Sequence, residues 1–589
     1  MRVGALLCVC ALLASGCGDD SGAGGSSGSG GTNATGGGTS TGPGGSLPTG
    51  GNAGTGGVAA FDASAESEIG TADASPDRAP PPSSFAVVTN RYDNNRTGAN
   101  TQEPFLNTSN VKAGQFGLLF SRMYDGNPYA QPLYIPGLAI SGGKHNVVYI
   151  ATSTNNVYAF DADDPAAAAP YWSKQVAPVG EVMVGGTAPR PNGWTWCKDM
   201  FPFSGITGTP VIDLPNQRMF LVTQEGKLGG EYALKLHALD LVTGNELGGG
   251  PVAITATVDG TGDGNVGGKI TMDNWRNFNR SGLTLFNGTL YIAMTSHCDE
   301  NPYHGWFLAY DPDTLTQRSI FNATPNGKGA AIWQSGVGVA ANEKGLFFST
   351  GNGSWNASGS ALGLSVVRMN LDNTLGDWFT PYNADSLNST DADLTGGVLL
   401  IPNSNYLVSG GKEGVIYLID QTNMTHFNAS ADGIAQRVAL GKGDIHDFVF
   451  YRNRIYVWPD GKPLYAYPFV NNRLDTAGVQ MYQGRTPVHP GGIMTISADG
   501  TTDGTAILWA TVVTSGEAWH SIAVGALLAI DAMNPSVLLW DSTMNAFDNL
   551  GNLAKFSPPT VANGKVYVTT FANAYATSPS YLRVYGLKN

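Results

Sequence analysis

Short apolar runs separated by glycine, asparagine and aspartate recur along most of the chain. The first clear set lies at residues 131–172, where apolar runs at 132–135, 146–151 and 156–160 alternate with polar turns. The runs are rich in Val, Tyr and Ile, which favour strands, and the breaks are rich in residues that favour tight turns. This pattern predicts a meander of antiparallel strands.

A similar unit returns down to the C-terminus. The first apolar runs of the units lie at 132–135, 209–212, 282–285, 336–340, 397–400, 448–450, 492–494 and 559–561. The spacing leaves room for a four-stranded sheet in each unit. We therefore predict an all-β fold, an eight-bladed β-propeller in which each four-stranded antiparallel sheet buries its two faces against its neighbours. Seven blades are the alternative, if the weak sixth unit merges with a neighbour.

One apolar run has no partner in its own unit and is expected to close the ring. It spans residues 116–120, before the first unit. A propeller needs closure because an open ring would expose strand edges at both ends. We expect this run to form the outer strand of the last blade, beside residues 581–587.

Five units carry an aspartate directly after their third apolar run. These residues are Asp161, Asp240, Asp311, Asp420 and Asp531. Each carboxylate is expected to accept backbone N–H groups in the turn that follows. Trp172 and Trp540 follow two of these turns and are expected to cover the neighbouring blade.

The composition suits a strand-dense fold with many turns, and it excludes one function class. Charged residues make up 13% of the chain, against about 25% in an average soluble protein, and 79 residues are glycine. The net charge is −14 and no basic run is present. Nucleic-acid binding needs clustered Lys and Arg, so we predict no nucleic-acid partner.

The N-terminus predicts export. Arg2 precedes a short apolar stretch that ends in small residues just before Cys17, as in a secretory signal. The stretch resembles a bacterial lipobox, although Ala14 stands where that motif has Leu. The resemblance implies a signal peptide at 1–16, a lipid on Cys17 and, because Gly18 follows, anchoring in the outer membrane of a Gram-negative bacterium. An ordinary secretory signal is the alternative.

The chain between the signal and the propeller is rich in Gly, Ser and Thr. Residues 17–84 hold too few apolar side chains to offset chain entropy, so we predict a disordered tether followed by a propeller domain at 85–589. Cys197 and Cys298 are the two cysteines left after the signal and the lipid. An oxidising compartment favours a disulfide between them; two buried free thiols are the alternative.

Several motifs resemble secreted bacterial PQQ-binding-like β-propeller proteins, relatives of the quinoprotein alcohol dehydrogenases. The matching stretches lie at 95–98, 206–213, 296–299, 303–306, 323–327, 332–336, 410–414 and 555–568. The resemblance covers the chain from about residue 90 to its end. It implies the propeller fold, with the innermost strands lining an axial channel and a ligand site at one end of that channel.

The resemblance also implies which residues would meet a bound cofactor. Pyrroloquinoline quinone (PQQ) is a planar tricarboxylate that needs cations, an aromatic face and a nearby calcium. Arg280, Lys412 and Lys555 would bind its carboxylates, and Trp333 would stack on it. The other positions expected at the channel mouth are Gln131, Thr209, Ser281, Gln334, Thr395, His446, Asp447, His489 and Ser557.

Two further residues would serve a dehydrogenase. Asp447 and Asn279 would hold the calcium, and Asp447 would also take the proton of an alcohol substrate. His297, Asp299 and His304 are residue types that bind zinc. Their spacing matches no metal motif, so we expect them to stabilise a loop.

The sequence is compatible with two functions. The chain lacks an adjacent Cys-Cys pair and a Cys-x-x-Cys-His haem motif. These absences favour a tethered, non-catalytic module that binds a partner protein, a glycan or a small molecule. The alternative is a PQQ-dependent alcohol or sugar dehydrogenase that passes electrons to a separate acceptor.

Overall fold

The computed structural model describes residues 85–178, 200, 203–226, 231–573 and 578–588. These residues belong to the second of two compact units, Ala79–Asn589. The secondary structure of this unit is nearly all β. Its described helices are α1 (Ala384–Ser389) and two 3-10 turns, η2 (Gln334–Gly336) and η3 (Ala546–Asp548). No described helix has the length and apolar character needed to cross a membrane.

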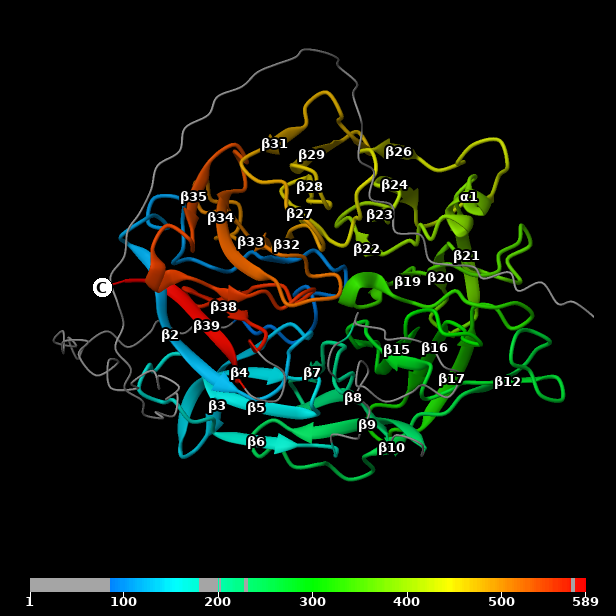
Figure 1. The fold of residues 1–589 in the computed structure, drawn as a ribbon, viewed down its shortest axis with the longest axis horizontal. Coiled ribbons are helices and arrows are strands. Elements are labelled where there is room, and N and C mark those ends of the chain that lie inside the picture. The colour runs from blue at the N-terminus through cyan, green and yellow to red at the C-terminus, as the bar shows by residue number, and fades with distance from the viewer. Residues whose placement is uncertain (1–84, 179–199, 201–202, 227–230, 574–577, 589) are drawn as a thin grey trace, which may run out of the picture. The chain divides into compact units, whose positions relative to one another are not determined.

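Eight antiparallel sheets form the blades of a propeller ring (Figure 1). From the innermost strand outward, blade one comprises β3 (Leu133–Ile140), β4 (Gly143–Ala151), β5 (Asn156–Asp161) and β6 (Trp172–Gln175), and blade two comprises β7 (Val211–Asp213), β8 (Arg218–Gly226), β9 (Tyr232–Asp240) and β10 (Val252–Ala253). Blade three comprises β14 (Thr284–Phe286) with β13 (Asn277–Asn279), then β15 (Thr289–Ser296), β16 (Trp306–Tyr310) and β17 (Gln317–Asn322). Blade four comprises β18 (Ala340–Asn342), β19 (Gly345–Ser349), β20 (Val366–Met369) and β21 (Leu375–Thr380), with β25 (His426–Phe427) added outside.

The remaining four blades follow the same order. They comprise β22 (Gly396–Leu400), β23 (Tyr406–Gly410), β24 (Val415–Asp420) and β26 (Gln436–Ala439); β27 (Phe448–Tyr451), β28 (Arg454–Val457) and β29 (Leu464–Val470) with β30 (Arg473–Leu474) and β31 (Gln480–Tyr482); β32 (Ile493–Ser497), β33 (Ile507–Ser515), β34 (Val524–Asp531) and β35 (Leu538–Asp541), with β36 (Gly551–Asn552) on β34; and β37 (Thr560–Ala562), β38 (Lys565–Thr569), β39 (Ser580–Leu587) and β2 (Phe116–Tyr124). A separate hairpin joins β11 (Thr257–Asp259) and β12 (Lys269–Thr271).

The predicted eight blades are confirmed, and the seven-blade alternative is wrong. The sixth unit does not merge with a neighbour, because β27, β28 and β29 form a sheet of their own. The predicted closure is also confirmed. β2 pairs antiparallel with β39 from Phe116–Leu587 to Tyr124–Ser580, so both ends of the propeller chain share the eighth blade (Figure 1).

The aspartate after the third strand forms the expected turn. Oδ1 of Asp161 accepts the N–H groups of Asp163 and Asp164, both at 2.8 Å. Asp240, Asp311, Asp420 and Asp531 accept N–H groups of their own turns in the same way. Trp172 then reaches the next blade, where its indole N–H donates to the carbonyl of Leu241 at 3.0 Å.

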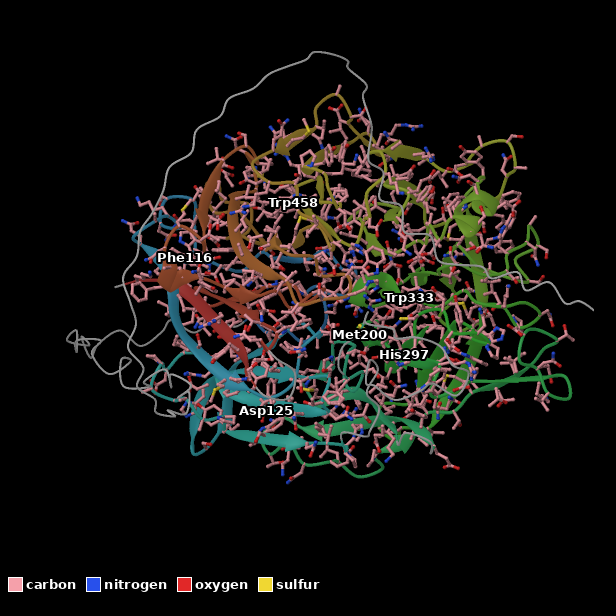
Figure 2. All side chains as sticks on the ribbon, in the orientation of Figure 1. Phe116, Asp125, Met200, His297, Trp333 and Trp458 are labelled. Atoms are coloured by element: carbon pink, nitrogen blue, oxygen red, sulfur yellow. The ribbon has the colours of Figure 1, made fainter. Side chains whose placement is uncertain are left out.

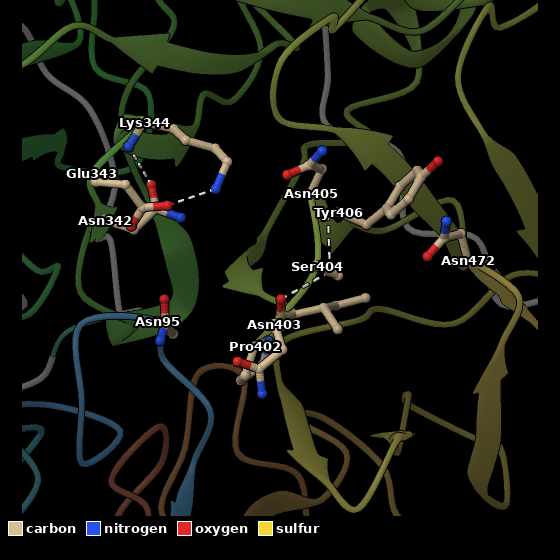
Figure 3. Close-up of a pocket in the computed structure, with 11 residues that line it drawn as sticks. Asn95, Asn342, Glu343, Lys344, Pro402, Asn403, Ser404, Asn405, Tyr406 and Asn472 are labelled. Carbon is tan, nitrogen blue, oxygen red and sulfur yellow. Dashed lines mark hydrogen bonds and ion pairs between the residues drawn. The ribbon is translucent and has the colours of Figure 1, made fainter.

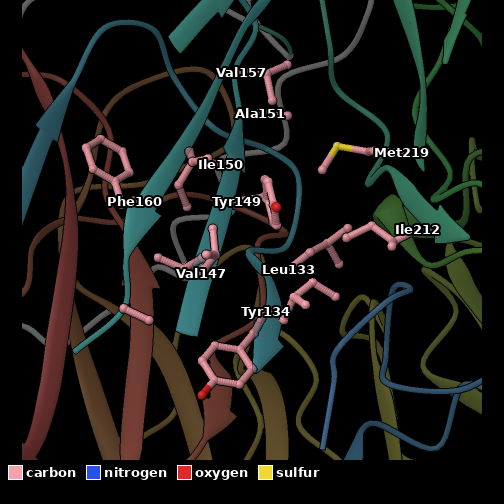
Figure 4. Close-up of a cluster of buried hydrophobic side chains, with 14 of the residues drawn as sticks. Leu133, Tyr134, Val147, Tyr149, Ile150, Ala151, Val157, Phe160, Ile212 and Met219 are labelled. Atoms are coloured by element: carbon pink, nitrogen blue, oxygen red, sulfur yellow. The ribbon is translucent and has the colours of Figure 1, made fainter. Parts of the chain in front are cut away.

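The hydrophobic core lies between the blades. Figure 4 shows one such layer, in which Leu133 of β3 and Tyr149 of β4 lie near Ile212 and Met219 of blade two. All four side chains are buried. Every blade repeats this arrangement because a sheet with two apolar faces can bury them only between two neighbours.

The axis of the ring is occupied by the chain itself. Residues 87–102, here called the axial segment, hydrogen-bond to the innermost strand of blade after blade. It includes β1 (Ala99–Asn100), which pairs parallel with β32. Other contacts join Val87 to Tyr134, Val88 to Ile212, Asn94 to Leu285 and Ala341, Asn95 to Leu400, Thr97 to Phe450, Gly98 to Ile496 and Asn100 to Val561.

This arrangement corrects the expected axial channel. The innermost strands face the axial segment, whose buried Arg91 and Arg96 fill the centre of the ring. The edges of the innermost strands would otherwise leave backbone N–H and C=O groups without hydrogen-bond partners, and the axial segment provides those partners.

Cys17 and Cys197 lie outside the described residues. The predicted lipid attachment and the predicted Cys197–Cys298 disulfide therefore stay predictions, as do the signal peptide and the tether.

Candidate functional site

The candidate site lies at one end of the ring, here called the loop face. Two kinds of loop meet there: those that lead into an innermost strand, and those that join the second strand of a blade to its third. Trp333 comes from a loop of the first kind and lies near the middle of the ring in Figure 2, whereas Phe116 of β2 lies near its rim. The fold thus gathers side chains that are far apart in sequence.

Aromatic and cationic side chains stack on one another at this face. The guanidinium of Arg280 lies 4.5 Å from the ring centre of Phe556 and 5.2 Å from that of Trp333. Trp519 lies beside His489 with ring centres 4.5 Å apart. These contacts join loops of blades three, four, seven and eight into one hub.

Two histidines and two aspartates form a compact group in the same region. The group comprises Asp444, His446, Asp460 and His489, and one ligating atom from each lies within 4.8 Å of the others. His446 Nε2 lies 3.8 Å from Asp444 and 4.0 Å from Asp460, and His489 Nδ1 lies 3.3 Å from Asp460. We call these four residues the His–Asp group.

The orientation of the His446 ring is fixed by a hydrogen bond at Nδ1, the ring nitrogen that faces away from the aspartates. The hydroxyl of Ser335 donates to the carbonyl of Thr395 at 2.8 Å, and it also lies 2.8 Å from His446 Nδ1. A hydroxyl has one proton to donate, so it must accept from Nδ1–H. Nε2 of the neutral ring is then a lone pair that faces the two aspartates.

Carboxylates outnumber cations at the hub. Lys412 binds Asp391 at 2.9 Å and Asp393 at 2.8 Å. Burial, followed by the charge of Asp393, raises the pKa of Asp299 to about 7. Burial raises the pKa of Asp444 to about 6, and burial followed by the charge of Asp444 raises that of Asp460 to about 8. The hub therefore disfavours further negative charge.

The structure brings some of the predicted cofactor residues together at the loop face. Arg280, Trp333, Lys412, His446 and Lys555 all contact this region, with Lys555 Nζ 2.8 Å from the carbonyl of Trp519.

Two other predicted positions, Gln131 and Thr209, belong to the axial network, whereas Gln334 bonds to residues of blades three and four. Gln131 accepts the N–H of Arg91 at 2.8 Å, and Thr209 lies 3.3 Å from Asn90. Gln334 is fully buried and accepts the N–H of Ser349.

The proposed calcium pair is divided between two networks. Asp447 forms an ion pair with Arg91 at 2.8 Å and accepts the N–H of Met494 at 2.7 Å. The side-chain amide of Asn279 donates to the carbonyls of Ser281 and Ala293, both at 3.0 Å. Asp447 thus has a structural partner, and its buried position raises its pKa despite the charge of Arg91.

The histidines around Cys298 serve a loop, as expected. His297 stacks on Phe278 with ring centres 4.1 Å apart and contacts Gln224. His304 instead contacts Thr324 and the carbonyl of Asp263. Their ring nitrogens therefore point to separate partners.

Sequence reasoning missed Asp444, Asp460, Trp519 and Phe556 as hub residues. The first two sit in short Gly-Asp and Pro-Asp-Gly stretches that resemble ordinary turns. The signal that could have indicated Asp444 is its position, because it lies in the same loop before β27 as the predicted residue His446.

The opposite end of the blades has a polar hollow of about 640 Å³ (Figure 3). It lies at the turns β18–β19, β22–β23 and β29–β30, and its asparagines include Asn403 and Asn472. Both have left-handed φ angles of 58° and 59°, which asparagine tolerates in tight turns. The turn geometry explains these residues without a ligand.

Comparison with solved structures identifies the fold. A quinohemoprotein alcohol dehydrogenase from Comamonas testosteroni matches with a TM-score of 0.54 and 14% identity, over 85% of this chain and 80% of that one. The quinohemoprotein alcohol dehydrogenase ADHIIG from Pseudomonas putida HK5 matches with a TM-score of 0.52 and 13% identity, over 86% and 80%. The chain therefore shares the propeller fold of these two enzymes. No protein-family model matches the chain, and no curated protein matches it.

Proposed function

We propose that this quinoprotein-like propeller is a non-catalytic binding module whose hub takes a small polyhydroxylated ligand, such as a sugar. The ligand would bind at the loop face, against Trp519. Aromatic rings cover the apolar faces of such molecules, and carboxylates accept hydrogen bonds from their hydroxyl groups.

The surplus of acceptors at the hub carries this proposal. Among the described residues, five carboxyl groups lie there, those of Asp299, Asp391, Asp393, Asp444 and Asp460, together with the cationic side chains of Arg280, Lys412, Lys442 and Lys555. A ligand rich in hydroxyl groups suits such a surface, because a carboxyl group can hydrogen-bond to a hydroxyl in either of its protonation states.

Titration calorimetry with a panel of mono- and disaccharides tests the proposal. Replacing Trp519 by Leu should weaken sugar binding about tenfold or more, because an aromatic contact in a binding site is worth at least 1–2 kcal/mol. Trp378→Leu is the matched control, since that indole stacks on His426 in the outer strands of blade four. Sugar binding that is absent from the wild type, or unchanged in Trp519→Leu, would overturn the proposal.

A PQQ-dependent alcohol or sugar dehydrogenase is the second candidate. The structural likeness to quinohemoprotein alcohol dehydrogenases and the hub cations favour it. The hub fits the quinone poorly, because the guanidinium of Arg280 lies over the ring of Trp333 and Lys412 already binds two carboxylates. If the quinone binds, Arg280 and Lys555 would hold its carboxylates, and it would supply hydride acceptance from the alcohol.

Reconstitution separates the two functions. Purified protein is incubated with PQQ and calcium, and reduction of an artificial dye is followed with alcohols and sugars as substrates. Dye reduction that depends on PQQ supports the dehydrogenase. Sugar binding without dye reduction supports the binding module.

We also propose that the chain is an outer-membrane lipoprotein. The lipobox-like sequence before Cys17 and the Gly/Ser-rich stretch after it support this location. Replacing Cys17 by Ser should release the protein from the membrane fraction into the soluble fraction, as judged by fractionation and by mass analysis for a lipid. Unchanged fractionation would contradict it.

A further inference from the structure

We infer that the His–Asp group is a binding site for a divalent first-row transition-metal ion, with Zn²⁺ as the probe of choice. The inference concerns Asp444, His446, Asp460 and His489 alone and does not depend on the proposed sugar ligand. Two imidazole nitrogens with two carboxylate oxygens form a ligand set that suits Zn²⁺ better than Ca²⁺ or Mg²⁺, which prefer oxygen alone.

The spacing of the four residues is close to that of a bound site. Neighbouring ligands in a tetrahedral zinc site lie about 3.3 Å apart, given metal–ligand distances of about 2.0–2.1 Å. The measured separations are 3.3 Å between His489 and Asp460, 3.8 Å between His446 and Asp444, and 4.0 Å between His446 and Asp460. All four ligating atoms lie within 4.8 Å of one another, so side-chain movements of about 1 Å would complete the coordination.

The group contains buried acceptors that face one another. Oδ2 of Asp444 and Oδ1 of Asp460 are buried and accept no hydrogen bond from the described residues. Because the Ser335 hydroxyl accepts a hydrogen bond from Nδ1–H of His446, Nε2 presents a lone pair to the same space. Buried acceptors without donors are costly unless a cation lies between them.

The surroundings also resemble those of a metal centre. The Ser335 hydroxyl fixes the ring of His446 through its second nitrogen, as outer ligands do at metal sites. Phe556 lies 5.3 Å from His446 and 5.6 Å from His489, ring centre to ring centre. Its ring limits access of water on that side.

The backbone provides the four ligands from three loops of two neighbouring blades. Asp444 and His446 precede β27, Asp460 follows β28, and His489 precedes β32. All three loops are anchored by strands of blades six and seven. A bound ion would therefore join these blades at the loop face.

Zinc titration of the full chain, freed of metal with a chelator, tests the inference. Calorimetry and elemental analysis after dialysis should give one Zn²⁺ per chain. Asp460→Asn and Asp444→Asn should each weaken Zn²⁺ binding at least about tenfold, because the amide loses the charge of the carboxylate ligand. Substitution of Co²⁺ should give the visible absorption of a tetrahedral site in the wild type and not in Asp460→Asn.

Asp391→Asn is the matched control. It removes a hub carboxylate that binds Lys412 and lies outside the group, so it tests whether negative charge alone attracts the ion. We expect the Zn²⁺ affinity of this variant to lie within about threefold of the wild-type value, since the charge of Asp391 is partly exposed and is therefore screened by salt.

Thermal unfolding gives a readout that a structural role would not produce. Asp460→Asn should raise the melting temperature of the metal-free protein, because it relieves repulsion with Asp444, while removing the increase that Zn²⁺ causes in the wild type. The inference would be overturned if the wild type retained less than about 0.1 Zn²⁺ per chain, or if Asp460→Asn and the wild type bound Zn²⁺ equally well.

Discussion

Buried charges show how far a residue's role depends on its partner. Asp447 follows His446 at the mouth of blade six and has the residue type of a catalytic base. In the structure it pairs with Arg91 of the axial segment, and both side chains are almost completely buried. The pair therefore has a structural role, holding the axial segment to blade six.

Removing one partner of that pair should destabilise the protein strongly. Asp447→Asn leaves the guanidinium of Arg91 buried without its counter-charge, which costs about 3–5 kcal/mol. Urea denaturation measures the loss. The control is Asp503→Asn, which breaks the exposed pair with Arg452 at 2.7 Å and should cost less than about 1 kcal/mol. Equal effects would contradict the assignment.

The carboxyl of Asp299 should make stability depend on pH. Its pKa is raised to about 7 by burial and by Asp393, with Asp391, Lys412 and Tyr303 also facing it. Between about pH 4 and pH 7 the folded protein holds a proton here that the unfolded chain releases, so the stabilising contribution falls as pH rises.

Asp299→Asn should flatten this dependence. Asparagine tolerates the left-handed φ of 50° at this position and carries no charge. The variant should match the wild type near pH 4 and exceed its stability at pH 8 by about 2 kcal/mol. The measurement is urea denaturation across pH. A pH profile parallel to that of the wild type would show that Asp299 is ionised in the folded state.

The axial segment is the element of the fold least expected from the sequence. It has little strand character, yet its contacts reach the innermost strands of all eight blades. Arg96 alone donates to Thr89, Asn90, Thr284 and Val339, at 2.6–3.1 Å. Its planar fork of donors meets acceptors in several directions at once.

Arg96→Lys should therefore be far from neutral. The lysine ammonium keeps the charge but cannot reach the acceptors of blades three and four together, so buried carbonyls lose their donors. We expect a loss of about 3 kcal/mol, measured by chemical denaturation. Arg473→Lys, at an exposed turn of blade six, is the control and should change stability by less than about 0.5 kcal/mol.

At the scale of the whole molecule, the ring is closed by pairing its two ends. β2 and β39 exchange backbone hydrogen bonds along their full length, and Phe116 of β2 packs on Trp509 and Trp540 of blade seven. Neither end can leave without exposing a strand edge and an interblade core. Stability is therefore shared around the ring.

Deleting β39 should abolish cooperative unfolding. Without residues 580–589, β2 and β38 lose their common partner and blade eight exposes apolar surface to water. Calorimetry should show a broad transition or none, and the truncated chain should bind a dye for exposed apolar surface. A single sharp transition at the wild-type temperature would show that the ring does not need this closure.

The sequence alone determined the blade count, the Asp turns and the closing strand. These features are local or repeated, so the alternation of apolar runs with turn residues in each unit was enough to predict them. The pairing of 116–120 with 581–587 followed because one run was left over in a closed ring.

Only the tertiary structure decided the contents of the hub. Asp444 and Asp460 lie in stretches that resemble ordinary turns, and Arg91 lies some 350 residues before its partner Asp447. Their meeting depends on the angle between blades and on the path of the axial segment, and neither leaves a periodic pattern in the sequence. Side chains brought together across a ring are specified by geometry, because no local propensity records which loops will face the same axis.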